Sequence, residues 1–244
     1  MLINDDPRSE DRLTPVVAQF RRRGLDVRMV RENRSVPAAR HRGTELTSGA
    51  VLLHLDSDMC APPGLLAQCR HLIEERGLDA LVIPEVSVGQ GFWARCKVLE
   101  KRCHDGDASV ESLRCLRRDL YDRVGGYDPT LHWAEDKDLD LRVRATGARL
   151  GTTGLALTHD EGAITLGGTM RKKAGYAATA RRYAAKHPAA FAGQANPFRL
   201  VRLAVRGWRL SRDPVLVAGL MLLKGCEFLA AGLVLAGVDR SRRG

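Results

Sequence analysis

Two aspartates, Asp56 and Asp58, stand one residue apart directly behind the apolar run AVLLHL at 50–55. Carboxylates at positions i and i+2 on a tight turn can both bring oxygens to one hard cation. Mg²⁺ and Mn²⁺ accept carboxylates, water and substrate phosphates as ligands. Aspartate is also a good N-cap, so the same sequence fits a polar turn that begins the next helix. The pattern therefore indicates either a divalent-metal site or a helix cap.

A second carboxylate cluster lies further along the chain, before a predicted helix that ends at Gly147. Its four acids are Glu135, Asp136, Asp138 and Asp140. Acidic side chains in a first helical turn are favoured by the helix dipole, which is a purely structural explanation. The preceding segment, 124–133, is rich in turn residues, and such loops often carry functional side chains. The cluster fits both explanations.

Strands and helices alternate in the part of the chain that must position these acids. Apolar runs at 50–56 and 78–86 are typical of strands buried on both faces, as in a parallel sheet covered by helices. Helical patterns at 14–24, 35–49 and 62–77 each end at a glycine. This alternation predicts an open α/β sheet. Ligands of such sheets bind beyond the carboxyl ends of the strands, which is where the DSD sequence falls.

Three stretches together resemble the family 2 glycosyltransferases, whose GT-A fold is a Rossmann-like, mostly parallel sheet flanked by helices. They are ENRSVPAARHRG at 32–43, DSDM at 56–59 and GGYDPTLHWAEDKDLDLRVRATG at 125–147. The resemblance covers roughly residues 1–165. It implies a nucleotide-diphosphate sugar as donor and Mg²⁺ or Mn²⁺ as cofactor. It also implies direct displacement by an acceptor hydroxyl, with inversion at the anomeric carbon.

The resemblance implies a role for each motif. Asp56 and Asp58 would hold the metal and the sugar nucleotide, and Asp136 of the ED pair would serve as general base on the acceptor hydroxyl. Arg40 would lie near the nucleotide, although His41 stands where the family usually has asparagine. A metal neutralises the departing diphosphate. A positioned carboxylate typically contributes about 10²–10⁴-fold as a general base.

Other side chains are expected to border the same site. His159 is expected to ligate the metal or touch the diphosphate, with a hydrogen-bonded loop histidine as the alternative. Trp93 and Glu135 are placed on the acceptor side. Phe92 and Trp93 can stack on a sugar or an acyl chain, and packing under a loop explains them equally well.

The first residues of the chain depart from the family pattern. Asp5 or Asp6 is expected at a strand end that faces the nucleotide, and Ser109 and Glu111 are expected near the acceptor. A complete family member has a strand–helix unit before that strand end, and we expect this unit to be absent here. Three alternatives follow: the chain starts late, a partner supplies the missing edge, or the nucleotide site is impaired. The alternative function is a non-catalytic GT-A remnant that binds a nucleotide or a membrane partner.

Charge is distributed unevenly along the chain. Residues 1–161 carry 24 Lys and Arg against 26 Asp and Glu, whereas residues 162–244 carry 15 against 3. A helical pattern in the basic part places arginines 199, 202, 206 and 209 on one stripe. Such a stripe fits an anionic lipid surface or an ordinary solvated face. We expect a catalytic domain at 1–165 and a helical extension at 166–244 that meets an anionic membrane surface.

The apolar run at 214–238 is long enough to cross a bilayer, which takes about 20 residues. Lys224 and Glu227 would each cost about 2.5–3.5 kcal/mol at its centre, but at this spacing they can pair. We therefore expect a helix that docks in the membrane interface or on a partner, ahead of a simple span or a core helix. A lipid-linked acceptor fits this location.

Composition narrows the remaining classes of function. The six cysteines form no CxxC pair, which favours reduced cysteines in a cytoplasmic protein over a structural zinc site. The basic part ends in an apolar, lipid-like run, so a nucleic-acid binder ranks last. The leading prediction is a cytoplasmic glycosyltransferase that is peripheral to, or anchored at, the inner face of the cell membrane.

Overall fold

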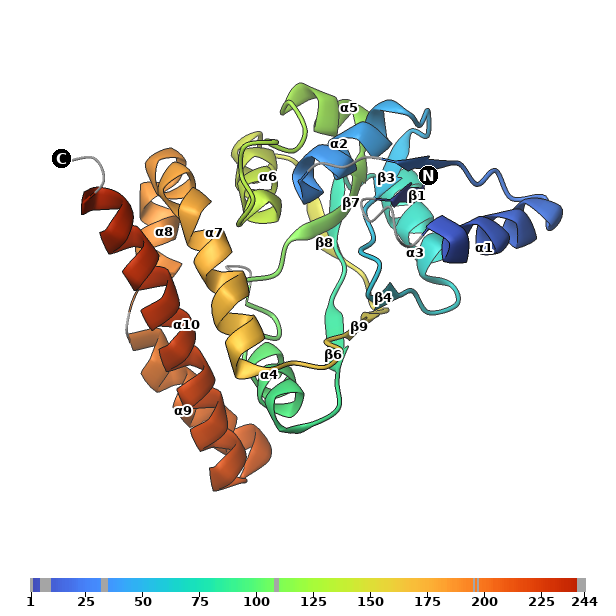
Figure 1. The fold of residues 1–244 in the computed structure, drawn as a ribbon. Helices are drawn as coiled ribbons and strands as arrows, with labels where there is room; N and C mark the ends of the chain where they lie inside the picture. Colours follow the sequence, from blue (N-terminus) through green and yellow to red (C-terminus); the bar gives the residue numbers. More distant parts are fainter. Residues whose placement is uncertain are drawn as a thin grey trace.

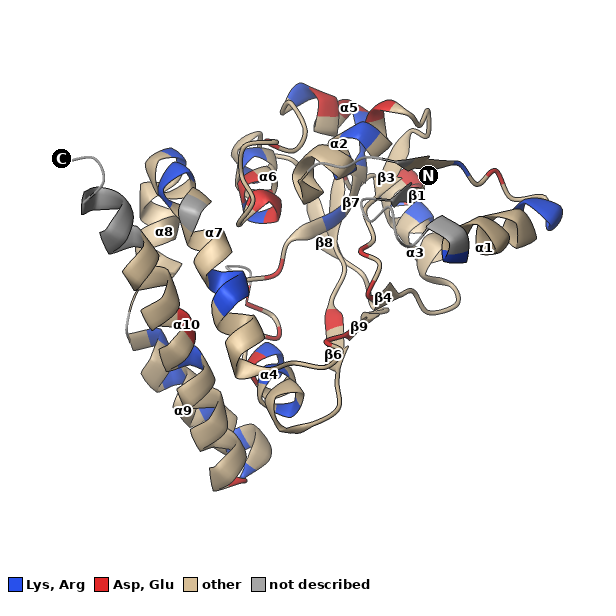
Figure 2. Ribbon diagram, in the orientation of Figure 1, with Lys and Arg blue, Asp and Glu red and all other residues tan. Residues whose placement is uncertain are grey.

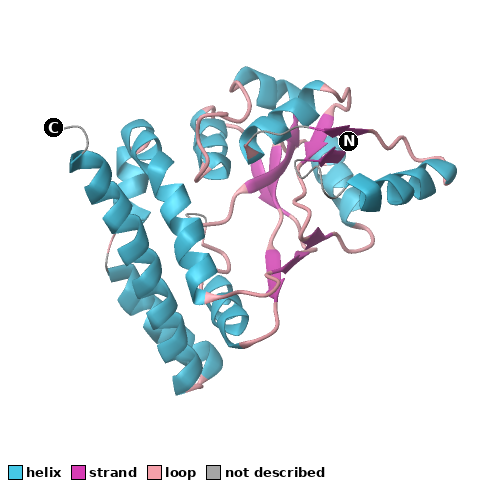
Figure 3. Cartoon of the chain, in the orientation of Figure 1, coloured by secondary structure: helices cyan, strands magenta, loops and turns pink. Residues whose placement is uncertain are grey.

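The computed structural model describes residues 2–4, 10–31, 35–107, 110–194, 196 and 198–240. Its strands are β1 (Leu2–Asn4), β2 (Met29–Arg31), β3 (Val51–Leu53), β4 (Met59–Cys60), β5 (Ala80–Val82), β6 (Glu85–Val88), β7 (Leu113–Arg117), β8 (Leu150–Thr152) and β9 (Leu157–Asp160). Its helices are α1 (Glu10–Arg22), α2 (Val36–Glu45), α3 (Leu65–Arg70) with a π-helical continuation (His71–Glu75), α4 (Phe92–Arg102), α5 (Arg118–Arg123), α6 (Glu135–Ala145), α7 (Leu166–Lys186), α8 (Pro188–Gln194), α9 (Phe198–Ser211) and α10 (Pro214–Arg240). Figure 3 shows the strands in the middle with helices on either side.

The central sheet has the strand order β3-β7-β5-β8. β7 is antiparallel to both of its neighbours, and β5 is parallel to β8, so β3, β5 and β8 share one direction. The prediction of an α/β fold with a mostly parallel sheet flanked by helices is confirmed, with β7 as the reversed strand. The carboxyl end of β3 leads directly into the DSD sequence.

Both faces of the central sheet carry a hydrophobic core, because successive residues of a strand point to opposite sides. Ala80 and Val82 of β5 pack in one cluster with Val143 of α6. Leu81, between them, packs on the other face with Ile73, in the continuation of α3. Burial on both faces explains why this strand has the nearly continuous apolar sequence seen at 78–86.

A smaller sheet, with the strand order β4-β9-β6, lies beside the central one and positions the end of the DSD turn. β4 and β9 are antiparallel, and Met59 pairs with His159 in their register. β9 and β6 are parallel, and His159 pairs with Ser87. Because Met59 directly follows Asp58, this pairing brings the DSD turn beside His159.

The C-terminal helices form a layer on the side of the molecule away from α1 (Figure 1). α10 packs along α7, α4 and α9. A third core cluster joins Leu99 of α4 to Leu203 of α9 and Leu220 of α10. The division of the chain near residue 165 stays a prediction. In the structure α7 begins at Leu166, and the shared cluster holds the two parts in contact.

Within the described residues, one helix is long and apolar enough to cross a membrane by length and composition, over Pro214–Val234 of α10. Only 33% of this window is buried in the protein. Lys224 and Glu227 form the predicted pair, with 2.6 Å between Nζ and Oε2. Both also approach charged residues of α4, so the polar side of the helix is its protein-facing side.

Candidate active site

Asp56 follows β3 and lies between two arginines from other parts of the chain. One carboxylate oxygen accepts a hydrogen bond from Nη2 of Arg40 in α2, and the other lies 3.3 Å from Nη1 of Arg114 in β7. Burial alone would raise the pKa of Asp56, but the two guanidinium groups outweigh it and hold the pKa below its ordinary value. Asp56 is therefore an ionised carboxylate that positive charges hold in place.

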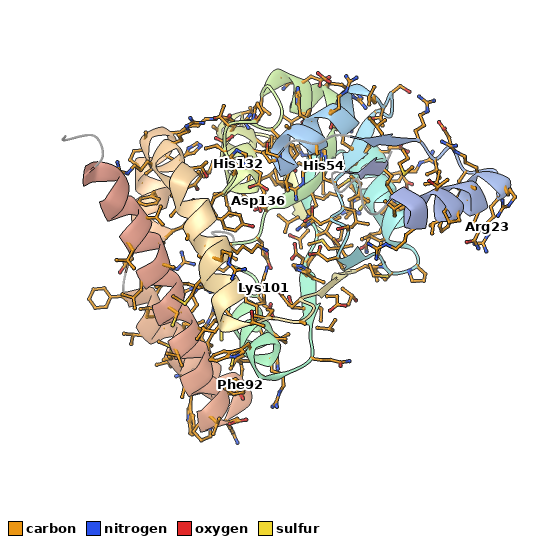
Figure 4. The ribbon with its side chains drawn as sticks, in the orientation of Figure 1. Arg23, His54, Phe92, Lys101, His132 and Asp136 are labelled. Atoms are coloured by element: carbon orange, nitrogen blue, oxygen red, sulfur yellow. The ribbon has the colours of Figure 1, made fainter. Side chains whose placement is uncertain are left out.

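Arg40 joins the two acid motifs that the sequence analysis singled out. Its Nη1 donates to Oε1 of Glu135, at the start of α6, over 3.0 Å, while its Nη2 contacts Asp56. The guanidinium group also lies over the ring of Tyr127, 5.4 Å from the centroid. Figure 4 shows His54, just before the DSD sequence, and Asp136 in the same part of the molecule. The structure thus brings the DSD and ED motifs together around one arginine.

Asp58 is the open member of the DSD pair, with 53% of its side chain exposed. Its Oδ2 lies 3.3 Å from Nε2 of His159, and Nδ1 of that histidine lies 3.4 Å from Oε2 of Glu85. Glu85 raises the pKa of His159. Burial opposes ionisation of Glu85, but His159 and Arg114 lower its pKa to about 2. The predicted residues Asp58 and His159 are therefore in contact.

Two charged residues of the site, Arg114 and Glu85, were not predicted. Nε of Arg114 donates to Oε1 of Glu85 over 2.7 Å, which places Glu85 next to the arginine that faces Asp56. The carbonyl of Arg114 accepts a hydrogen bond from the amide of His54 over 2.9 Å. The antiparallel pairing of β3 with β7 therefore sets Arg114 beside the DSD sequence. Neither residue has a distinct local signal, because β7 carries two arginines, Arg114 and Arg117, and Glu85 is simply the first residue of β6.

The ED pair opens α6 behind Ala134, whose φ of 59° lies in the left-handed region. Burial, followed by the charge of Asp136, raises the pKa of Glu135 to about 7, although Arg40 opposes this shift. Asp136 is half-buried, and its Oδ1 accepts a hydrogen bond from the amide of Lys137 over 2.8 Å. Among the described residues Asp136 has no ion-pair partner. Asp136 is thus the more available acid.

Asp138 is fully buried and held by three basic side chains. Its Oδ2 accepts a hydrogen bond from Nη2 of Arg142 over 2.6 Å, and its Oδ1 lies 2.8 Å from Nζ of Lys186 and 2.7 Å from Nε2 of His187. Arg142 belongs to α6, whereas Lys186 ends α7 and His187 follows it. Asp138 therefore fastens α6 to the C-terminal helices and does not face a ligand.

The loop before α6 rests on the same helices. The ring of Trp133 lies 5.4 Å from that of Tyr183 in α7 and 6.3 Å from that of Phe191 in α8, both edge-on. Residues 166–194, expected only as part of a membrane-associating extension, thus also support the start of the ED helix. Sequence reasoning missed this role, since nothing local links these aromatic residues to Trp133.

Phe92 and Trp93 pack on the C-terminal helices in this structure. Phe92 lies at the end of α4 remote from α6 (Figure 4), and a Cβ at Gly219 of α10 would meet its ring at 2.4 Å. Trp93 packs against the third core cluster, and its ring lies 5.0 Å from that of Phe92. The packing explanation accounts for both rings, and an acceptor-side role for Trp93 stays a prediction.

Three of the predicted residues, Asp5, Asp6 and Ser109, lie outside the described residues. Glu111 accepts a hydrogen bond from the amide of Gly106 over 2.9 Å, which ties it into its own loop. The role of Asp5 or Asp6 near the nucleotide stays a prediction, as do the roles of Ser109 and Glu111 near the acceptor.

A cavity of about 590 Å³ lies between α6, α8 and α9, away from the DSD turn. It is lined by charged side chains that include Lys137, Asp140, Arg144 and Arg199. None of the residues predicted for the active site lines it. The candidate site is therefore an open edge of the sheet, not this cavity.

A mixed sheet flanked by helices, with one acid pair behind β3 and another at the start of α6, is the arrangement of a GT-A glycosyltransferase. The family model described as Glycosyl transferase family 2 matches residues 1–123. The chain belongs to this family and is a glycosyltransferase. The match includes the DSD sequence and ends before the ED pair.

Solved structures of glycosyltransferases share this fold. A mannosyltransferase from Pyrobaculum calidifontis, PcManGT in complex with GDP-Man and Mn²⁺, is similar at a TM-score of 0.55 and 15% identity, over 96% of this chain and 76% of that one. Residues 1–349 of S. aureus TarS are similar at a TM-score of 0.50 and 14% identity, over 98% of this chain and 81% of that one. Among curated proteins, none matches this sequence.

Proposed function

We propose that the protein transfers a sugar from a nucleotide-diphosphate sugar to an acceptor hydroxyl, with inversion and with Mg²⁺ or Mn²⁺ as cofactor. The observation that carries this proposal is the contact of Arg40 with both Asp56 and Glu135, which puts the donor-side and acceptor-side acids on one surface. The complex of the similar mannosyltransferase with GDP-Man and Mn²⁺ supports the same class of donor and cofactor.

The residues present fit a divalent cation. Asp58, with 53% of its side chain exposed, and His159, with 15% exposed, lie 3.3 Å apart and offer a carboxylate and an imidazole. Among the described residues no group of three or more His, Cys, Asp or Glu side chains is arranged to hold a metal. We therefore assign the remaining ligand positions to water and to the diphosphate, as is usual for Mg²⁺. When bound, the ion neutralises charge that develops on the departing diphosphate.

Asp56 differs from Asp58 because both of its oxygens contact arginines. We assign Asp56 to the nucleotide sugar, which its ion pairs with Arg40 and Arg114 position. Arg40 fits the nucleotide end of the donor, since a planar guanidinium recognises phosphate oxygens well. Direct coordination of the metal by Asp56 stays a prediction.

Asp136 fits the general base. The acceptor oxygen attacks the anomeric carbon, its proton passes to the Asp136 carboxylate, and the bond from that carbon to the diphosphate oxygen breaks. Asp138 and Asp140 are buried in ion pairs with neighbouring basic residues, which leaves Asp136 as the accessible carboxylate beside Glu135. We place Glu135, with its raised pKa of about 7, on the acceptor side.

We place this reaction at the cytoplasmic face of a membrane, with a lipid-linked acceptor as the leading candidate. The basic composition of residues 162–244 and the apolar helix α10 support this location. The reaction chemistry does not depend on it, and the two are tested separately.

The test of the chemistry is calorimetric binding of a panel of nucleotide sugars with and without Mn²⁺. We expect a donor that binds tightly only with the metal, and we expect Asp58→Asn to remove this metal-dependent binding. Asp119→Asn, an exposed acid on α5, is the matched control. If Asp58→Asn binds donor and Mn²⁺ as the parent does, the metal assignment is wrong.

A further inference from the structure

The outward face of α10 is apolar from Val215 to Leu233. Val215, Leu222, Leu229 and Leu233 recur at helical spacing, and between 54% and 73% of each residue is exposed. A surface helix of a soluble protein turns its apolar stripe inward and its charges outward. α10 shows the reverse, and Figure 2 shows its described part almost entirely without charge colour.

The two charged residues in the middle of α10 are turned into the protein. Nζ of Lys224 lies 2.8 Å from Oε1 of Glu100 and 2.6 Å from Oε2 of Glu227. Glu227 is 4% exposed and also lies 3.7 Å from the ammonium groups of Lys97 and Lys173. These five residues form an ion cluster that fastens α10 to α4 and α7. Between Pro214 and Val234, where side chains are described, the outward face therefore carries no charge of its own.

α9 continues this surface with a second apolar stripe. Phe198, Val201, Val205 and Trp208 are exposed at helical spacing, while Leu203, on the opposite side, is buried. α9 packs closely on α10, because Gly207 leaves room for Leu220, at 3.5 Å from where a Cβ would be. The two helices thus present neighbouring apolar stripes.

Arginines flank the apolar stripe of α9. They are Arg199, Arg202, Arg206 and Arg209. Arg199 lines the cavity beside α6, and Arg206 donates to the carbonyl of Cys103 over 2.7 Å. Arg202 pairs with Asp107 over 2.9 Å but keeps 61% of its side chain exposed, and Arg209 is exposed. A helix with apolar residues, a tryptophan and a row of cations on its exposed side is typical of binding in the interface of an anionic bilayer. A neutral partner surface would not account for the arginines, whereas an anionic bilayer attracts them.

We propose that the exposed faces of α9 and α10 form one surface that docks in the plane of an anionic bilayer without crossing it. The ion cluster holds α10 along α4 and α7, so the helix cannot also be surrounded by lipid. This proposal goes beyond the proposed reaction by assigning the membrane surface and its mode of binding, and it requires neither donor nor metal.

The test is co-sedimentation of the full chain with vesicles of neutral or anionic lipid. We expect binding to anionic vesicles at low salt and weaker binding to neutral ones. Leu222→Asp with Leu229→Asp should weaken binding at least about tenfold, because each places a charge in an apolar interface. Leu66→Asp, equally exposed but on α3, is the matched control and should bind as the parent does. Thermal unfolding verifies that all three chains are folded.

A second measurement separates docking from spanning. Alkaline extraction should release the bound chain, since an in-plane helix has no segment through the bilayer. Retention in the vesicle pellet would overturn the in-plane mode. A parent chain that stays in the supernatant with anionic vesicles at low salt would overturn the surface itself, as would normal binding by the folded double variant. A parent that instead dimerises through these helices, shown by sedimentation velocity, would also overturn it.

Point variants are needed because α10 completes the third core cluster. A chain ending at Asp213 would uncover Leu99 and Leu203, and its behaviour would report on misfolding. The vesicle assay contains no sugar nucleotide, so its failure leaves the proposed sugar transfer intact. Loss of donor binding in Asp58→Asn likewise says nothing about the bilayer.

Discussion

The protein contains two networks of ion pairs, which we call the open row and the enclosed row. One lies at the active site and the other lies between α10 and the helices beneath it. The first runs from Glu135 through Arg40, Asp56 and Arg114 to Glu85, and it ends at an exposed aspartate, Asp58. The second joins α4, α7 and α10 through the ion cluster around Glu227, which is 4% exposed. One row is open at its end and the other is enclosed.

The difference between the two rows follows from what each must do. Taking charges out of water is costly, and a buried ion pair recovers that cost only when all its partners are in place. The enclosed row has fixed partners on three helices, so it fastens those helices together. The open row keeps Asp58 at the surface beside the mostly buried His159, and a ligand can replace their mutual contact. The exposure of Asp58 is thus the feature that distinguishes the binding site from the ion cluster that holds the helices together.

The largest expected effect is on the enclosed row. Glu227→Ala leaves Lys97, Lys173 and Lys224 close together, and we expect a loss of about 3–5 kcal/mol in the free energy of unfolding. Asp58→Asn, in the open row, should change it by less than about 1 kcal/mol. Urea unfolding of both variants measures the difference. Equal losses in the free energy of unfolding for Glu227→Ala and Asp58→Asn would contradict the distinction between a structural and a ligand-binding network.

The next effect is on turnover at the open row. Asp136→Asn should lower kcat by about 10²-fold or more while donor affinity stays nearly unchanged, because Asp136 acts on the acceptor. Steady-state kinetics and donor binding should be measured on the same protein. Near-normal turnover would remove Asp136 from the mechanism and direct attention to Glu135.

Acid should weaken the open row in a defined pH window. The folded pKa of Glu85 is about 2, below its ordinary value of 4.5, so its stabilisation is complete above pH 4.5 and is lost as the pH falls toward 2. With a discount for partial exposure, we expect about 2 kcal/mol. Glu85→Gln should be less stable than the parent at pH 7, and the gap should shrink by pH 3. A gap that does not depend on pH would contradict the assignment.

The smallest effect concerns the attachment of α6 to α7. His187→Ala should lower kcat about tenfold with little change in donor affinity, because it loosens Asp138 and shifts the start of α6. His187→Gln, which can still donate a hydrogen bond, should restore part of the loss. His132→Ala, an exposed histidine beside the ED pair (Figure 4), is the control. Identical kcat in the two alanine variants would show that His187 positions nothing.

Local features of the site were predictable and distant ones were not. An apolar run placed Asp56 at a strand end, and turn residues followed by acids placed Asp136 at a helix start. Arg40 was identified through the family resemblance. Arg114 requires the antiparallel pairing of β7 with β3, which no local pattern reveals. His187 requires the packing of α7 on α6, which again joins distant parts of the chain.

The orientation of α10 shows the same limit. Its sequence is apolar on nearly every side, so periodicity alone does not tell the packed face from the exposed one. Lys224 and Glu227 were predicted to pair, and they do, but their direction depends on Glu100 and Lys97 of a helix far earlier in the chain. Lys224 and Glu227 therefore show which face of α10 packs on the protein only when the position of α4 is known.

The contacts of Asp138 decide how separable the two parts of the chain are. Two of the three basic side chains that contact this buried carboxylate, Lys186 and His187, lie beyond residue 165. A chain cut at that boundary would keep only Arg142 beside Asp138 and would uncover Leu99 on α4. Residues 1–165 are therefore not an independent unit, and exchanging the C-terminal helices for those of a relative would change the contacts of Asp138 and, through them, the position of α6.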